Sequence, residues 1–293
     1  MNSQATEERE QRELAGYNAS RVAPRLPQEV DASADLARML RQRHLELTAL
    51  EQWRAEVAHR AAEAPRHGAS FVRWFEDLRE IGPGQHDSLF PWLAEQAPLE
   101  AMRWFLTQEV AGEAGFDDLV ALTQLGMPVR AKLEMGSNYW DELGQGHLEG
   151  MHGPLLARLA EHLALPHDAA VVVESLQLSN LMLAMAHHRQ YAFHSVGALG
   201  VIELTAPGRA VYVNAGLKRL GVPAAARRYF ALHATLDVKH SEAWNREVLA
   251  PLVDEDPARA PAIAEGALMR LEAGARCFDR YRSELGLVDR AAA

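Results

Sequence analysis

Apolar residues return at every third or fourth position along almost the whole of this 293-residue chain, which is the period of an α-helix. Strand-type alternation is nearly absent, and its best candidate, residues 171–173, lies inside a helical pattern. An α-helix repeats about every 3.6 residues and a β-strand every two, so this pattern of apolar residues predicts an all-α fold. We expect helices over residues 35–62, 71–79, 99–110, 116–125, 129–140, 147–163, 166–185, 189–205, 209–219, 224–250 and 257–281.

The chain divides into a polar N-terminal stretch and a long helical remainder. Residues 1–33 are polar and contain Pro24 and Pro27, so we expect a mobile N-terminal arm, laid over a neighbouring chain. Residues 34–293 show no internal repeat and are long enough for a substantial core, which predicts a single helical domain.

Charge and cysteine content exclude several classes of protein. The formal net charge is −10, from 30 Lys and Arg against 40 Asp and Glu, so no basic surplus exists to bind nucleic acid. The single Cys277 excludes an intramolecular disulfide and a cysteine-ligated metal cluster. No apolar run reaches the roughly 18–20 residues of a membrane span, and the N-terminus has no apolar signal region. We therefore expect a cytoplasmic enzyme.

Two imidazoles and a carboxylate stand at helical spacing near residue 235. His233, Asp237 and His240 occupy positions i, i+4 and i+7, which fall within about 60° of one another on an α-helix. Neutral imidazoles and carboxylates are ligand types that suit iron or manganese. If this face points inward, the helix carries a metal; the alternative is a solvated face with a local ion pair.

Two carboxylates stand among apolar neighbours. Glu203 has no other formal charge between Arg189 and Arg209, and Glu109 shares a helical face with Phe105. Because burying an unpaired carboxylate is costly, a metal partner would explain their positions. The alternatives are a buried ion pair for Glu203 and a surface position for Glu109.

A further carboxylate and imidazole surround a glycine-rich break. Glu142 and His152 lie ten residues apart, and Glu149 with His152 forms the Glu-x-x-His pair common in di-iron helical bundles. Gly144 and Gly146 can break the helix between Glu142 and His152, in which case Glu149 is a substitute ligand.

The order Glu, Glu-x9-His, Glu, His-x3-Asp-x2-His resembles the haem-oxygenase-like di-iron oxidases and oxygenases, the iron-containing redox enzymes. The segment 138–146, Asn-Tyr-Trp-Asp-Glu-Leu-Gly-Gln-Gly, is similar to that family's most recognisable stretch. The resemblance covers roughly residues 100–245. Carried over by position, it implies the ligands Glu109, Glu142, His152, Glu203, His233, Asp237 and His240.

The resemblance implies a haem-oxygenase-like bundle of about seven core helices, with extra N-terminal helices. It also implies a cofactor of two Fe(II)/Fe(III) ions, with Mn compatible at one site, and O2 as co-substrate. Family chemistries are N-oxygenation, desaturation and oxidative C–C cleavage, which predicts a small-molecule substrate of amino-acid or fatty-acid type. An external electron donor and a homodimer are compatible with this reading.

Two other functions fit the same scaffold. The first is a cofactor-free or organic-cofactor enzyme, because a fold does not determine a function. Relatives that hydrolyse thiamin use a cysteine nucleophile, and Cys277 stands far along the chain from the proposed ligands; a haem ligand would have to be His44, which has no supporting motif. The second is a non-catalytic metal-binding protein.

Overall fold

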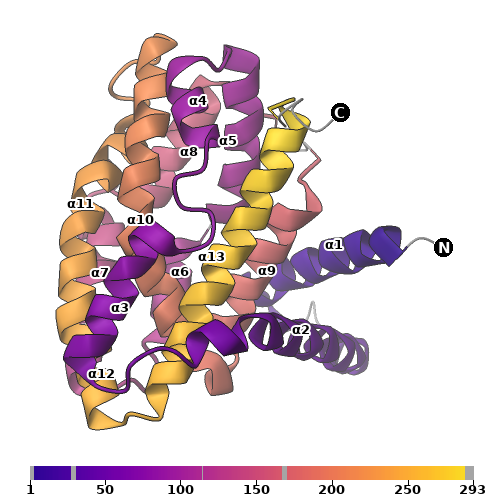
Figure 1. Cartoon of the computed structure of the whole chain (residues 1–293). Coiled ribbons are helices and arrows are strands. Elements are labelled where there is room, and N and C mark those ends of the chain that lie inside the picture. Colours follow the sequence, from indigo (N-terminus) through magenta and orange to yellow (C-terminus); the bar gives the residue numbers. More distant parts are fainter. Residues whose placement is uncertain (1–2, 28–30, 114, 167–169, 288–293) are drawn as a thin grey trace, which may run out of the picture.

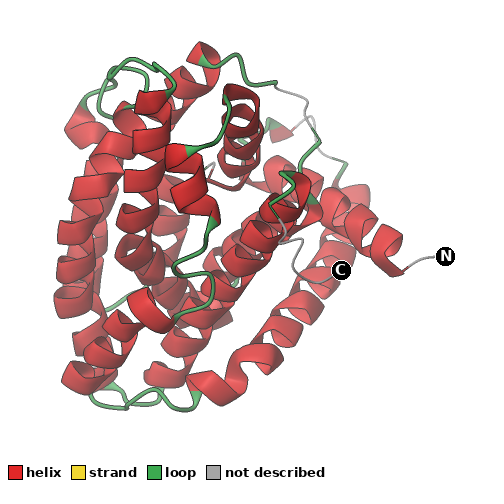
Figure 2. Cartoon of the chain, turned by 45° about the horizontal axis from the view of Figure 1, so that its top comes forward, coloured by secondary structure: helices red, strands yellow, loops and turns green. Residues whose placement is uncertain are grey.

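The described part of the chain, residues 3–27, 31–113, 115–166 and 170–287 of the computed structural model, consists of helices and loops without strands (Figure 1 and Figure 2). The elements are α1 (Ser3–Val22), α2 (Ala32–Ala61), α3 (Gly68–Ile81), α4 (Leu89–Glu95), α5 (Leu99–Glu113), α6 (Phe116–Thr123), α7 (Val129–Glu142), η2 (Gly144–Gly146), α8 (His152–His162), α9 (Val173–His187), η3 (Arg189–Tyr191), α10 (Ala192–Arg219), α11 (Arg228–Trp244), η4 (Asn245–Leu249), α12 (Ala250–Glu255) and α13 (Arg259–Glu284). This confirms the all-α prediction. None of the described helices combines the length and apolar character needed to cross a bilayer.

Helix α10 is the centre of the bundle and packs against both α11 and α13 (Figure 1). Most residues over 192–205 are buried on every side, as in a central helix. A Cβ at Gly197 would lie 1.9 Å from the backbone oxygen of Ile263, and a Cβ at Gly266 would lie 1.9 Å from that of His194. Glycine at these two positions therefore sets the spacing between α10 and α13.

Helix α10 also runs without interruption through Pro207. The sequence predicts two helices here, ending at residue 205 and resuming at 209, and that prediction is wrong. Proline lacks the N–H that would bond the Glu203 carbonyl, at a cost of about 3 kcal/mol in a helix interior. The far half of α10 buries Val213 and Leu217, each contributing roughly 1.5–3 kcal/mol, so packing outweighs the local cost.

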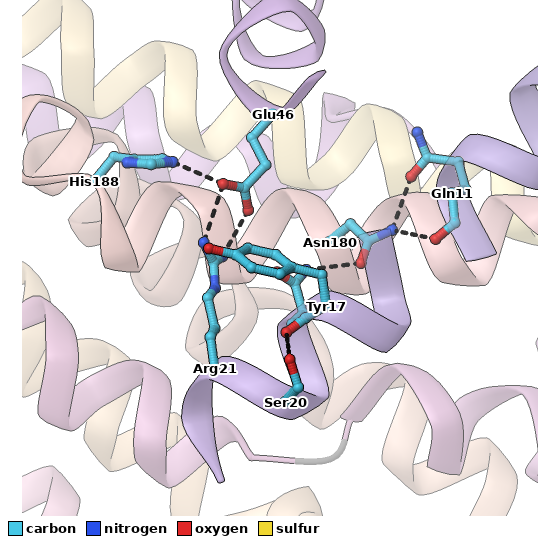
Figure 3. A network of polar contacts seen from close by, with 8 residues as sticks. Gln11, Tyr17, Ser20, Arg21, Glu46, Asn180 and His188 are labelled. Carbon is cyan, nitrogen blue, oxygen red and sulfur yellow. Dashed lines mark hydrogen bonds and ion pairs between the residues drawn. The ribbon is translucent and has the colours of Figure 1, made fainter. Parts of the chain in front are cut away.

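Residues 3–22, predicted as part of a loose arm, form helix α1, which packs against α9 and α2. Its Leu14 is buried, and Asn18 Nδ2 donates to Asn180 Oδ1 at 2.9 Å. Arg21 Nη2 lies 2.6 Å from Glu46 Oε1 of α2 (Figure 3). The docking depends on polar contacts between distant residues, and hydrophobic periodicity carries no signal of these. The division of the chain into arm and domain at residue 33 stays a prediction.

Other predicted helices differ in extent. The span 224–250 is divided into α11, the π-helical turn η4 and α12. Pro251 has no N–H for the preceding turn, which favours the wider π geometry there. The span 166–185 begins as α9 only at Val173, and residues 167–169 lie outside the described part.

Candidate metal centre

Five predicted ligands converge inside the bundle. Glu142, His152 and His233 form one group, and Glu142, Glu203 and His240 form a second; within each group one ligand atom per residue lies within 4.8 Å of the others. The residues come from α7, α8, α10 and α11. Glu142 belongs to both groups, so the two candidate metal positions share a carboxylate.

A tight turn brings Glu142 and His152 together. Helix α7 ends at Glu142 and α8 begins at His152, so the helix predicted from residue 147 starts five residues later. Between them Gly144 and Gly146 have φ of 61° and 84°, in the left-handed region that glycine adopts without penalty. A Cβ at Gly144 would also lie 2.4 Å from the carbonyl carbon of Gly150, which closes the turn to larger residues.

The first group contains two imidazoles in the form that binds metals. Burial lowers the pKa of His152 to about 4 and also lowers the pKa of His233, so both rings are neutral near pH 7. His233 Nδ1 lies 2.8 Å from the carbonyl oxygen of Tyr229, so the Nδ1–H donates and Nε2 is left as the ligand atom.

Both ring nitrogens of His152 are buried without a hydrogen bond. Its Nδ1 lies 2.6 Å from Glu142 Oε2 but outside hydrogen-bond geometry. Other buried imidazoles have carboxylate partners: His188 is bonded to Glu46 and His194 to Glu265. Because unsatisfied buried polar atoms are rare, a metal ion bound at one of these nitrogens would explain the arrangement.

The second group is held by two residues of α7. Asn138 Nδ2 donates to Glu203 Oε1 at 2.7 Å, and His240 Nε2 lies 3.0 Å from Asp141 Oδ2. Burial lowers the pKa of His240, but Glu203 and Asp141 outweigh it and raise the pKa to about 9. Burial and the Glu203 charge raise the pKa of Glu142 to about 8. Two buried carboxyl groups this close do not both ionise readily, and a bound metal ion would favour the ionised form of each.

The remaining predicted site residues lie beside these groups. Asp237 is 2% exposed and lines the same cavity, although its carboxylate is in neither group. Glu109 also lines the cavity, and its Oε1 accepts a bond from the Tyr281 hydroxyl at 3.0 Å rather than joining a group. Glu149 is exposed, so the structure places Glu142 at the centre and Glu149 outside it.

Sequence reasoning missed Asn138 and Asp141, which orient Glu203 and His240. Both lie in the segment 138–146 that carries the resemblance, and Asn138 precedes Glu142 by one helical turn, so that spacing was the available signal. The sequence of one helical turn does not reveal which distant side chains its residues will contact.

A cavity of about 370 Å³ adjoins the centre. Its walls are mainly apolar, from residues such as Phe105, Leu178, Ile202 and Phe230. Cys277 lines this cavity too, contrary to the expectation that it stands apart. Burial, with the nearby Glu109 charge, raises its pKa to about 12, so it is a thiol and not a thiolate nucleophile.

The family of this chain follows from these residues and from comparison with known proteins. The chain belongs to the iron-containing redox enzyme family, whose model matches residues 103–275, more than half of its length. No curated protein matches it.

Solved structures confirm the haem-oxygenase-like fold. A CADD-like protein of unknown function from Nostoc punctiforme, solved at 2.00 Å, is similar with a TM-score of 0.58 at 17% identity, covering 72% of this chain and 95% of that one. A second structure of it, at 1.35 Å, gives a TM-score of 0.57 at 16% identity, covering 75% and 96%. At this identity the likeness concerns the fold alone.

The donor set fits the iron that the family name implies. The described residues offer imidazoles and buried carboxyl groups in two overlapping groups. In the first group His152 and His233 are neutral near pH 7, and neither ring nitrogen of His152 has a hydrogen bond. Such nitrogen and oxygen donors suit Fe(II) and Mn(II).

Proposed function

We propose that this protein is an O2-activating non-haem di-iron oxidase or oxygenase acting on a small molecule. The observation that carries the proposal is the pair of ligand groups joined at Glu142. Each group would hold one metal ion, so a single ion would leave the donor atoms of the other group without a metal. Asp237 and Glu109, which line the same cavity, are the remaining ligands we propose.

When bound, an iron pair supplies O2 activation, with O2 as the oxidant and an external donor providing electrons. The chain itself provides orientation. Asn138 and Asp141 hold Glu203 and His240 in place, and the Tyr229 carbonyl selects the tautomer of His233. The apolar cavity walls exclude water and position the substrate carbon or nitrogen beside the centre.

We propose N-oxygenation, desaturation or oxidative C–C cleavage of an amino-acid or fatty-acid type substrate as the reaction range. Manganese at one position is compatible with the same donors. The high pKa of the Cys277 thiol speaks against a thiolate-based organic-cofactor reaction, and exposed His44 on α2 is unsuited as a haem ligand.

Anaerobic Fe(II) titration followed by O2 exposure tests the proposal. The wild-type protein should take up about two Fe(II) per chain and then consume O2 with a transient visible absorption. His233→Ala and His240→Ala should each reduce uptake to about one Fe(II) or fewer, because each removes a donor from a different group.

His59→Ala is the matched control, because this imidazole is 92% exposed on α2. It should bind iron as the wild type does. The proposal fails if both site variants bind as much Fe(II) as the control. Uptake without any O2 consumption would instead indicate a metal-binding protein.

A further inference from the structure

Arg270 is a buried cation in the cavity that forms no hydrogen bond or ion pair with the described residues. Arg270 of α13 is only 7% exposed and lines the cavity beside the metal centre. Within the part of the chain that the structure describes, its guanidinium makes no hydrogen bond or ion pair, whereas the neighbouring exposed arginines of α13, Arg276 and Arg280, pair with glutamates. An unpaired buried charge is costly, so such a group usually serves a ligand.

A glycine makes room for the guanidinium head. A Cβ at Gly274, one turn further along α13, would lie 2.9 Å from Arg270 Nη1 and 3.9 Å from the Phe278 ring. The head therefore extends over Gly274 and toward Phe278, which also lines the cavity. A larger residue at 274 would displace it.

Arg270 and the five converging ligands come from different helices. The five converging ligands stand on α7, α8, α10 and α11, whereas Arg270 stands on α13, and α10 packs against both α11 and α13 (Figure 1). The cavity lining thus includes two arginines, Arg209 of α10 and Arg270 of α13, together with the candidate ligands and an apolar surface that includes Ile202 and Phe105. A molecule that is complementary to this cavity lining has an anionic end and an apolar body.

We propose that Arg270 binds the carboxylate of the substrate and so orients its apolar body toward the metal centre. The planar fork of arginine matches a carboxylate with two parallel hydrogen bonds. The two oxygens of a carboxylate match the single fork of Arg270, whereas a phosphate ester adds a third oxygen that this fork does not reach. The orientation of the substrate toward a metal-dependent reaction rests on the proposed function. The binding of the carboxylate by Arg270 needs no metal.

Calorimetric titration of the metal-free protein tests the assignment. The probes are octanoate and 3-phenylpropanoate, their uncharged amides of the same shape, and octyl phosphate. Wild-type protein should bind each acid more tightly than its amide, and octanoate more tightly than octyl phosphate. Arg270→Met should weaken acid binding by roughly tenfold to a hundredfold, the range of a charged hydrogen bond, and leave amide binding unchanged. Arg270→Lys should show an intermediate loss.

Arg280→Met is the matched control, because Arg280 lies on the same helix, is 38% exposed and pairs with Glu284. It should keep the preference for acids. Arg270→Met should melt no lower than the wild type, since it removes an unpaired buried charge. The inference is overturned if neither acid binds better than its amide, if octyl phosphate binds best, or if Arg270→Met keeps the preference. Fe(II) uptake, measured separately, reports on the proposed function and should be unchanged in Arg270→Met.

Discussion

At the residue scale, the centre depends on which of two carboxylates near His152 points inward. Glu149 stands three residues before His152, the spacing that one continuous helix would require, whereas Glu142 stands ten before it. The turn through Gly144 and Gly146 breaks that helix, and Glu142 ends 4% exposed while Glu149 faces solvent. The positive φ angles that glycine permits in this turn therefore determine that Glu142, and not Glu149, points into the centre.

We expect Glu142→Gln to abolish tight binding of both Fe(II) ions, because Glu142 belongs to both ligand groups. Metal-free Glu142→Gln should melt no lower than the wild type, because a carboxyl group with a pKa of about 8 is mostly protonated near pH 7 and glutamine is a neutral side chain of the same shape. Fe(II) titration and thermal melting measure the two effects. Glu149→Gln is the control and should bind iron normally; a loss of iron in this variant instead would contradict the placement.

At the element scale, α1 is attached through a buried carboxylate rather than a large apolar face. Glu46 of α2 accepts from Arg21 of α1 and lies 2.9 Å from His188 Nε2 at the end of α9, as Figure 3 shows. Burial raises the pKa of Glu46, but the hydrogen bonds and charges of His188 and Arg21 outweigh it and hold the pKa below its ordinary value of 4.5. The network therefore joins three helices.

This lowered pKa predicts acid release of α1. Because the folded-state pKa of Glu46 lies below the unfolded value, its stabilisation is complete above about pH 5.5 and is lost as the pH falls through 4.5 toward the folded-state pKa. Hydrogen exchange over residues 3–22, corrected for the intrinsic pH dependence, should show protection lost in that window before the rest of the bundle.

Glu46→Gln should release α1 already at neutral pH, because removing one partner of a buried pair costs about 3–5 kcal/mol. Glu8→Gln is the control, since Glu8 forms an exposed pair with Arg12 within α1. Protection of α1 that is equal in the two variants would show that Glu46 does not anchor it.

At the scale of the whole molecule, the centre and the cavity depend on the spacing of α10 and its neighbours. Glu203 stands on α10 and Arg270 on α13, and these helices touch through Gly197 and Gly266 without intervening side chains. A change in that spacing would move the cation of the cavity relative to the metal ligands.

We expect Gly197→Ala to lower the free energy of unfolding by about 1–3 kcal/mol or more, because its Cβ would overlap the Ile263 carbonyl. Gly208→Ala, on the same helix with nothing within 4 Å, should instead raise it by about 0.5–1 kcal/mol by restricting the unfolded chain. Chemical denaturation checks both. Similar changes in the two variants would contradict the close packing.

The sequence by itself determined what short-range geometry controls. Helical period excluded strands, and the spacing of His233, Asp237 and His240 placed them on one helical face, because residues within two turns have a fixed angular relation. Tertiary structure decided the continuity of α10 through Pro207 and the docking of α1. It also decided that Glu142 rather than Glu149 points inward and that Arg270 is buried without a partner among the described side chains. These depend on which distant surfaces meet, and packing over many residues outweighs the local preferences from which a pattern is read.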